Sequence, residues 1–405
     1  MTATQILGVI GILLIIGFLA DYLFRKTSIP DIIILISLGY LIGPVFRIVE
    51  PSELAPATQI IATLALVVIL FDGGLNLDFD KILSTAHRAI FLVLLGIGIS
   101  MAATTAFVYY LLDWELLNSL LLGAIISGTS PSIVMPLVNR ARVSNEVSSM
   151  LSLESALNGA LVIIIALVVL EIMTTGTTEN GLSIAGQTIG IRFSLGLLLG
   201  AVAGIIWLWL LTLLEGEAYD DILTLAAVFV LYFIVESING SGVIFALVFG
   251  LMLGNGVRVA RVFRIKRTTE TTEIMKKFHS QISFFIKTFF FIYLGLIITF
   301  NEPGLIIHCV ALSILLLFSR YLAVLLSSLG SKTLLADRHL LTTMLPRGLS
   351  AAVLAQIVVT SGIPNASVYP DIIIVIILIT VTISAIGIPI FTKKAHEGEP
   401  KFGIG

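Results

Sequence analysis

The sequence predicts an all-α polytopic membrane protein, and three observations lead to this prediction. Of its 405 residues, 58% are hydrophobic and only 12% are charged, whereas soluble domains have about 25% charged residues. The apolar residues form long blocks, such as Ile6 to Ala20 and Ile372 to Ile390, and a helix needs about 20 such residues to cross a bilayer. The alternating segments of about ten residues that are typical of a membrane barrel do not occur.

The apolar blocks divide the chain, a single membrane domain over 1–405, into thirteen predicted spans. Ile29-Pro30-Asp31 and Tyr369-Pro370-Asp371 are typical helix starts, because proline fits the first turn. Only Arg258 to Lys277 forms a longer polar connection. The predicted spans are 4–23, 30–47, 57–75, 87–112, 116–139, 146–173, 185–214, 221–237, 242–257, 278–300, 304–329, 335–361 and 369–392.

The positions of the basic residues test this count. With thirteen spans, one side of the membrane carries 18 of the 23 Lys and Arg residues, while the other side carries only Arg47 and Arg192. A miscount by one span would place many basic residues on both sides of the membrane and remove this asymmetry. Since basic loops stay in the cytoplasm, we expect a multi-pass protein of the cell membrane with its N-terminus outside and its C-terminus in the cytoplasm.

Two predicted spans carry helix-breaking residues. The fifth contains Gly128-Thr129-Ser130-Pro131, and the twelfth contains Pro346-Arg347-Gly348. Proline removes a helix hydrogen bond, and glycine loosens the backbone. The two spans hold matching places in halves of opposite topology, spans 1–6 and 8–13, and interrupted helices at matching places indicate a transport site near the midplane. The alternative is that both breaks are ordinary kinks.

A possible ion site lies where the fifth and sixth spans meet. Glu154, Ser155 and Asn158 fall within one turn of the sixth span, so their oxygens are expected to share a face. The hydroxyls of Thr129 and Ser130 would add to this set. Oxygen ligands of this kind suit a hard monovalent cation, by the logic that applies to harder divalent ions.

Ionisable groups within a span are rare, because each costs roughly 3 kcal/mol at the bilayer centre. Glu154 has a second interpretation, as the partner of Arg320 in a structural ion pair, because a buried arginine stays protonated. Arg347 is placed to neutralise a helix C-terminus at the break. Lys287 lies among phenylalanines and is a candidate proton carrier. Asp72 either lines a cytoplasmic vestibule or marks a helix end.

The chain resembles the cation/proton antiporter superfamily, in particular the NhaP-type sodium/proton antiporters and their archaeal relatives. The resemblance covers nearly the whole length. It implies a core of helices 4–6 (87–173) and 11–13 (304–392) that moves against a scaffold of helices 1–3 (4–75) and 7–10 (185–300), which forms a homodimer. Five segments carry it in order: Leu70-Phe71-Asp72-Gly73-Gly74-Leu75, Gly128-Thr129-Ser130-Pro131, Glu154-Ser155-Ala156-Leu157-Asn158, Phe289-Phe290-Phe291-Ile292-Tyr293-Leu294-Gly295 and Arg347-Gly348-Leu349-Ser350-Ala351-Ala352.

The sequence departs from that family pattern at two positions. NhaP-type members usually read Thr-Asp-Pro where this chain has Thr129-Ser130-Pro131, and Asn-Asp where it has Asn158-Gly159. The second aspartate is the family's expected carrier of cation and proton. Gly159 therefore leaves the carrier position vacant, or it lets the fifth helix approach closely.

Two functions follow as hypotheses. The first is secondary antiport of Na⁺ or K⁺ against H⁺ by elevator-like alternating access in a lipid bilayer. The alternative is an impaired or uncoupled variant, a leak pathway or sensor, because of Gly159. The sequence has no P-loop, no basic domain for nucleic acid and no clear nucleophile–base arrangement, and Cys309 is its only cysteine. We therefore expect neither an enzyme nor a cofactor, and no metal beyond the transported cation.

Overall fold

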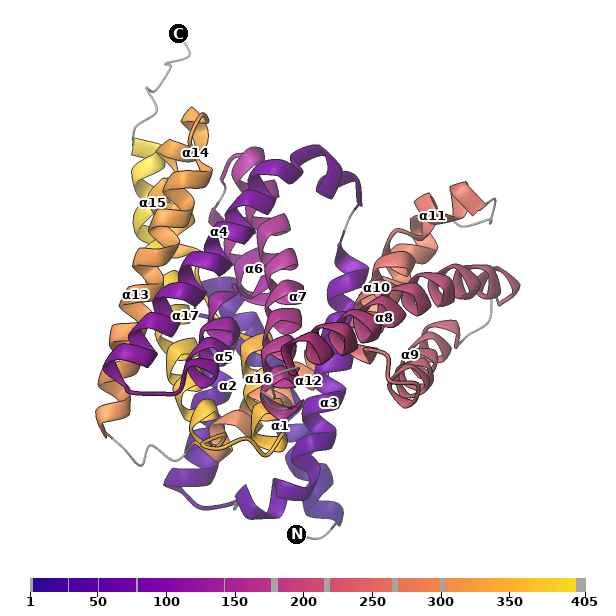
Figure 1. The fold of residues 1–405 in the computed structure, drawn as a ribbon, viewed down its shortest axis with the longest axis horizontal. Helices are drawn as coiled ribbons and strands as arrows, with labels where there is room; N and C mark the ends of the chain where they lie inside the picture. Colours follow the sequence, from indigo (N-terminus) through magenta and orange to yellow (C-terminus); the bar gives the residue numbers. More distant parts are fainter. Residues whose placement is uncertain are drawn as a thin grey trace.

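The structure, a computed structural model, describes residues 3–27, 29–49, 51–77, 79–141, 143–175, 181–214, 219–263, 269–298 and 303–397. No strand occurs among these residues, which confirms the all-α prediction. The α-helices are labelled in Figure 1. The elements are α1 (Ala3–Thr27), α2 (Asp31–Tyr40), the π-helix η1 (Leu41–Val45), α3 (Pro51–Asn76), α4 (Phe79–Leu111), α5 (Leu116–Ser127), α6 (Pro131–Ala141), α7 (Asn145–Thr175), α8 (Gly181–Leu213), α9 (Asp220–Ser237), α10 (Gly242–Gly254), α11 (Gly256–Phe263), α12 (Thr269–Ile297), α13 (Pro303–Ser327), α14 (Lys332–Ala336), α15 (Arg338–Thr343), α16 (Leu349–Thr360) and α17 (Val368–Glu397).

Several of these helices are long and apolar enough to cross a membrane. Within the described residues, seven stretches meet that condition, and α10 with α11 forms a further pair bent by 78°. Four shorter apolar helices lie at Ile10–Phe24, Asp31–Val45, Ile60–Asn76 and Leu349–Thr360. The chain is thus a multi-pass membrane protein, and the count of thirteen spans stays a prediction.

The polar connection expected from Arg258 to Lys277 is partly helical, which corrects its interpretation as a loop. Its first residues belong to α11, and its last belong to α12. In α11 the charged side chains of Arg258 and Arg261 face outward, while Val259 and Ala260 are buried. This spacing lets eight residues form a helix on the protein surface. Residues 264–268 lie outside the described part.

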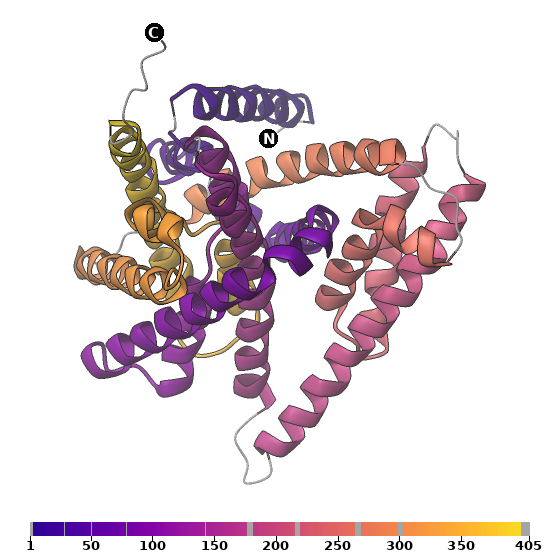
Figure 2. The same ribbon diagram turned by 90° about the horizontal axis from the view of Figure 1, so that it is seen from above.

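The helices pack as two groups. In one group α4 packs on α5, α7 and α13, while α17 packs on α13, α15 and α16. In the other, α10 lies between α3 and α8, and α12 packs on α2 and α3. Figure 2 shows α8 to α11 on one side of the molecule and the first group on the other. The groups meet where α16 contacts α3 and where α7 contacts α8.

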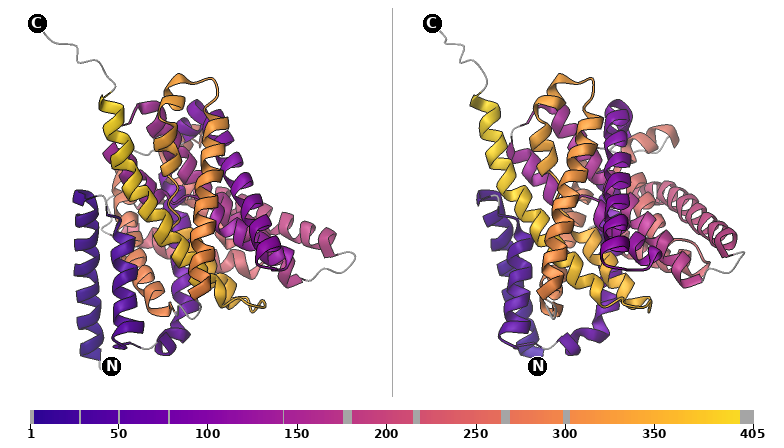
Figure 3. Two further views of the ribbon diagram at one scale, coloured as in Figure 1. Left: turned by 90° about the vertical axis from the view of Figure 1, so that its left-hand side faces the viewer. Right: turned by 60° about the vertical axis from the view of Figure 1, so that its left-hand side comes forward.

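Glycines allow helix backbones to touch in the second group. A Cβ added to Gly200 of α8 would lie 2.9 Å from Cβ of Val248 in α10. A Cβ added to Gly39 of α2 would lie 2.9 Å from Cα of Gly295 in α12, and the reverse distance is also 2.9 Å. Small residues at helix contacts are the usual means of close packing in a membrane. Further out, α1 runs along the edge of the molecule beside α2 (Figure 3).

Candidate functional site

Two interrupted stretches of backbone meet inside the first group. One joins α5 to α6 through Gly128, whose backbone is extended, and the other joins α15 to α16. The backbone N–H of Ser130 donates to the carbonyl of Pro346 across the two stretches, at 2.9 Å. A Cβ added to Gly348 would lie 2.6 Å from Cβ of Ser130, so only glycine permits this approach. We call this place the crossing.

Glu154 of α7 is fully buried beside the crossing. Its carboxylate accepts hydrogen bonds from both terminal nitrogens of Arg320 in α13, at 2.8 and 3.1 Å. Thr129 donates to Glu154 Oε1 at 3.1 Å, and the Asn158 amide donates to the same oxygen and to Thr129 Oγ1. The carboxylate therefore has a two-point charge partner and two neutral donors. A bidentate pair of this kind fixes geometry as well as charge.

The predicted oxygen set is only partly assembled. Asn158 Oδ1 is buried and has no hydrogen-bond partner in the described part of the chain. Ser130 Oγ shares a hydrogen bond with Ser132 Oγ at 3.0 Å. Ser155 is buried, and its hydroxyl donates to the Ser152 carbonyl of its own helix at 3.3 Å, so its place in the oxygen set stays a prediction.

Arg347 occupies the second interrupted stretch and is completely surrounded by protein. Its Nε donates to the Ile126 carbonyl at 2.5 Å, and one terminal nitrogen donates to the Leu345 carbonyl at 2.8 Å. Its backbone N–H donates to Thr380 Oγ1 at 3.1 Å. Ile126 lies in the last turn of α5, and Leu345 lies just beyond α15, where carbonyls have no partner within the helix. The guanidinium thus supplies hydrogen-bond donors and a positive charge to the C-terminal ends of two helices, which carry partial negative charge.

Gly159 lines a small cavity at the crossing. A Cβ added there would lie 3.6 Å from Ser350 Oγ and 3.9 Å from Pro131 Cδ, which are ordinary contacts. Close helix approach therefore does not require glycine at this position, which removes one of the two explanations for it. The cavity has room for about one water molecule. Its lining residues are Ile125, Gly128, Thr129, Ser130, Gly159, Val162, Gly348, Ser350 and Ala351.

The remaining predicted charges bond elsewhere. Lys287 Nζ lies 2.6 Å from Asp31 Oδ2, and the two side chains are 14% and 1% exposed. Asp72 is half-buried on α3, and its Oδ1 accepts from Ser280 Oγ of α12 at 3.3 Å. The sequence did not indicate that Asp31 is the partner of Lys287, because an acidic residue after proline is common at the start of a helix.

Two ion-pair clusters lie nearer the ends of the helices. Arg192 of α8 bonds Glu171 of α7 at 3.0 Å and Glu236 of α9 at 3.3 Å. Arg88 of α4 bonds Glu146 of α7 at 3.0 Å. The first cluster joins the two groups of helices, whereas the second lies within one group.

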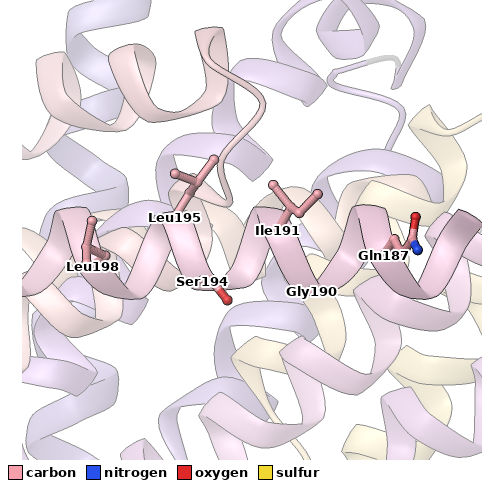
Figure 4. Close-up of a pocket in the computed structure, with 6 residues that line it drawn as sticks. All are labelled: Gln187, Gly190, Ile191, Ser194, Leu195 and Leu198. Carbon is pink, nitrogen blue, oxygen red and sulfur yellow. The ribbon is translucent and has the colours of Figure 1, made fainter.

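A further hollow lies on α8, the helix that also carries Arg192. It is an open groove along one side of α8, lined mainly by apolar side chains (Figure 4). The labelled residues, all from that helix, are Gln187, Gly190, Ile191, Ser194, Leu195 and Leu198. None of them is ionisable, so the crossing remains the candidate site.

The sequence of the chain matches a known protein family and is similar to individual proteins. A family model described as "Sodium/hydrogen exchanger, transmembrane" matches residues 10–394. The K(+)/H(+) antiporter NhaP2 of Shewanella sp. (strain ANA-3) is 26% identical over 404 residues, which cover 96% of this chain and 67% of that protein. The Probable Na(+)/H(+) antiporter 2 of Methanocaldococcus jannaschii is 25% identical over 384 residues, which cover 91% of this chain and 88% of that protein.

Solved structures with the same fold also exist. The sodium proton antiporter MjNhaP1 of Methanocaldococcus jannaschii at pH 8 superposes with a TM-score of 0.78 at 21% identity, covering 98% of both chains. An electron-microscopy map of MjNhaP1 gives a TM-score of 0.79 at 22% identity, covering 99% of this chain and 100% of that one. The chain spans about two thirds of the length of the NhaP2 proteins.

Proposed function

Because the chain belongs to the sodium/hydrogen exchanger family, we propose that it is a secondary antiporter that exchanges a monovalent cation, Na⁺ or K⁺, for protons. The resemblance to NhaP-type cation/proton antiporters that its motifs indicate is confirmed by the family match. The observation that carries the proposal is the buried oxygen of Asn158, which has no hydrogen-bond partner among the described residues. It lies beside Thr129 and Glu154, and a desolvated cation needs oxygens of this kind.

The cation in this proposal is held by oxygens from both sides of the crossing. Asn158 Oδ1, the hydroxyls of Thr129 and Ser130 and the freed carbonyls of the interrupted stretches supply them. Glu154 supports the site indirectly, because both its oxygens already accept from Arg320. The place of Ser155 in this set stays a prediction.

The movement we propose is an elevator-like one. The first group of helices carries the crossing and moves as the core, 87–173 with 304–392, against the scaffold, 4–75 with 185–300. The two groups touch over few elements, chiefly α16 with α3 and α7 with α8, which favours sliding over internal deformation. We further propose a homodimer formed through the scaffold in the cell membrane, with the N-terminus outside.

We also propose that exchange is slow or weakly coupled in the chain as it stands. The described charges near the crossing are one carboxylate, Glu154, and two guanidinium groups, Arg320 and Arg347. A second carboxylate for which cation and proton compete would enforce exchange, since the site then moves loaded with one or the other. Gly159 supplies none, although a Cβ at this position would make only ordinary contacts.

The test is cation-driven proton flux in proteoliposomes, followed with an internal pH dye after pulses of Na⁺, K⁺ or Li⁺. We expect little flux from the unmodified protein, and a rise of at least tenfold for Gly159→Asp. Gly159→Asn is the matched control, because it has the same shape without the charge, and it should not raise the flux. Fast exchange by the unmodified protein that Gly159→Asp abolishes would show that the cation is handled elsewhere. Cation flux without proton flux would instead support a leak pathway.

A further inference from the structure

Arg192 of α8 is fixed to its scaffold neighbours by its backbone and by one side of its guanidinium. Its carbonyl accepts from the backbone N–H of Ser241 at 2.9 Å, beside Gly196, where an added Cβ would lie 2.5 Å from the Ser241 carbonyl oxygen. One terminal nitrogen bonds Glu236 Oε2 of α9 at 3.3 Å, and the other oxygen of Glu236 accepts from the Gly242 N–H at 2.7 Å. The helices α8, α9 and α10 together therefore set the position of Arg192.

The other side of the same guanidinium reaches the second group of helices. Its remaining terminal nitrogen bonds Glu171 Oε2 of α7 at 3.0 Å. The side chains of Arg192, Glu171 and Glu236 are 31%, 27% and 33% exposed, so water reaches all three. With thirteen spans they lie at the outer ends of their helices, on the side where Arg47 is the only other basic residue. One guanidinium thus bridges a carboxylate of the core and a carboxylate of the scaffold.

Movement of the core would affect the two bonds of Arg192 differently. Glu236 travels with Arg192 because both belong to the scaffold, whereas Glu171 belongs to α7 and moves with the core. When the bond to Glu171 breaks, the guanidinium still has Glu236 beside it and is open to water, so no bare charge is left buried. An exposed pair changes a population ratio by only up to about fivefold, which is small enough to be reversed in each cycle.

We propose that Arg192 is a latch between core and scaffold: its bond to Glu171 stabilises the position of the core in this structure, and the bond opens when the core moves. We call this arrangement the latched position. The inference rests on the elevator-like movement proposed above, but not on which cation is exchanged or how fast. Arg88 and Glu146 provide the contrast, because their pair has the same length, 3.0 Å, and exposures of 31% and 40%, but it joins two helices of the core.

The test measures the distance between core and scaffold within single chains. Spin labels are attached to Leu111→Cys of α4 and Ile222→Cys of α9, whose native side chains are 64% and 52% exposed, while the native Cys309 is buried. The two labels lie at opposite ends of the predicted spans, so movement across the bilayer changes their distance. Labelled protein is diluted with unlabelled protein in vesicles, with choline as the only small cation. Double electron–electron resonance then gives the ratio of latched chains to chains at other distances.

We expect Glu171→Gln to lower this ratio by about two- to fivefold, because the pair is partly exposed. Raising the concentration of choline chloride should lower the ratio in the unmodified protein but not in Glu171→Gln, since salt screens the pair. In the Arg192→Gln protein the ratio should already be low, and adding Glu171→Gln should lower it no further. This cycle separates the bond to Arg192 from any other contact of Glu171.

Two further variants make the test specific. Glu236→Gln keeps an oxygen for the Gly242 N–H but removes the charge that remains beside Arg192 after opening, so the ratio should not fall. Glu146→Gln is the matched control inside the core and should leave the ratio unchanged. An unchanged ratio in Glu171→Gln, or an equal fall in Glu236→Gln or Glu146→Gln, would overturn the latch.

Failure of the latch is distinguishable from failure of the proposed function. Two distances that do not respond to Glu171→Gln would overturn the latch alone. One fixed distance in every variant would overturn the latch together with the proposed movement. Antiport itself is measured separately as cation-driven proton flux.

Discussion

Two buried ion pairs stabilise the two groups of helices, and they are built differently. Glu154 and Arg320 are 0% and 3% exposed, they share two hydrogen bonds, and Thr129 and Asn158 add two more donors. Asp31 and Lys287 share one bond at 2.6 Å, and Lys287 is 14% exposed. The first pair lies beside two interrupted helices, whereas the second joins α2 to α12, whose backbones touch at Gly39 and Gly295.

The difference indicates that the two ion pairs have different structural roles. The glycine contact already fixes the spacing between α2 and α12, so the single bond between Asp31 and Lys287 only strengthens that contact. Interrupted helices leave backbone groups without a partner in their own helix, so the crossing adds polar bonds to the glycine contact between Gly348 and Ser130. The crossing therefore depends on polar bonds for its shape.

The largest expected effect comes from breaking the pair beside the crossing. Glu154→Ala leaves a buried guanidinium without a charge partner, and such a loss typically costs about 3–5 kcal/mol. We expect a sharp fall in melting temperature in detergent, with much of it recovered by Glu154→Gln combined with Arg320→Gln. Equal melting temperatures for Glu154→Ala and the unmodified protein would show that the pair contributes no stability.

A second prediction tests the glycine contact between α2 and α12. Gly295→Val places side-chain atoms where the backbone of Gly39 and Tyr40 lies within 2.9 Å, and overpacking of this kind costs about 1–3 kcal/mol. Gly98→Val is the matched control, because a Cβ there has nothing within 4 Å. The melting temperature should fall for the first variant only. A similar fall for both would mean that valine itself, and not the contact, is responsible.

A third prediction compares the two pairs directly. Asp31→Asn should cost about 1–2 kcal/mol, less than Glu154→Ala, because an orphaned lysine can release its proton while an arginine cannot. Proton flux through the Gly159→Asp protein should be unchanged by Asp31→Asn, since the pair lies away from the crossing. A loss of flux at equal protein stability would move Lys287 into the transport mechanism.

The smallest effect is expected for Arg192→Gln. All three side chains of its cluster are about one third exposed, so the loss should stay below about 1 kcal/mol and shrink further at high salt. The cluster joins α7 to α8 and α9, which belong to different groups of helices. We therefore expect a change in transport rate that exceeds the change in melting temperature. Equal, large effects on both would indicate an ordinary structural contact.

The sequence was sufficient for the helical class. The proline and glycine residues that predict interrupted spans stand just beyond the ends of α5, at Ser127, and α15, at Thr343. The partners of buried charges were harder to predict. Lys287 and Asp31 are 256 positions apart, and no local pattern connects them.

Two other features required the structure for a physical reason. Whether Gly159 is needed for packing depends on the distance to Ser350 and Pro131, which follows from how two half-helices meet. The helix α11 was not predicted because two of its eight residues are arginines and a polar, basic stretch follows it, and short basic stretches are typical of loops. Only the burial of Val259 and Ala260 shows that they form a helix docked on its neighbours.

Arg347 has a further consequence, which concerns the membrane voltage. Glu154 and Arg320 cancel each other's charge, whereas in the described part of the chain the side chain of Arg347 bonds carbonyls and no carboxylate. If the core moves as proposed, this charge is carried through the electric field with it. A full crossing of one elementary charge is worth about 2.3 kcal/mol per 100 mV. A resting potential that is negative inside would therefore favour the inward position of the core even before a cation binds. The bound cation would then cross the field together with the charge of Arg347.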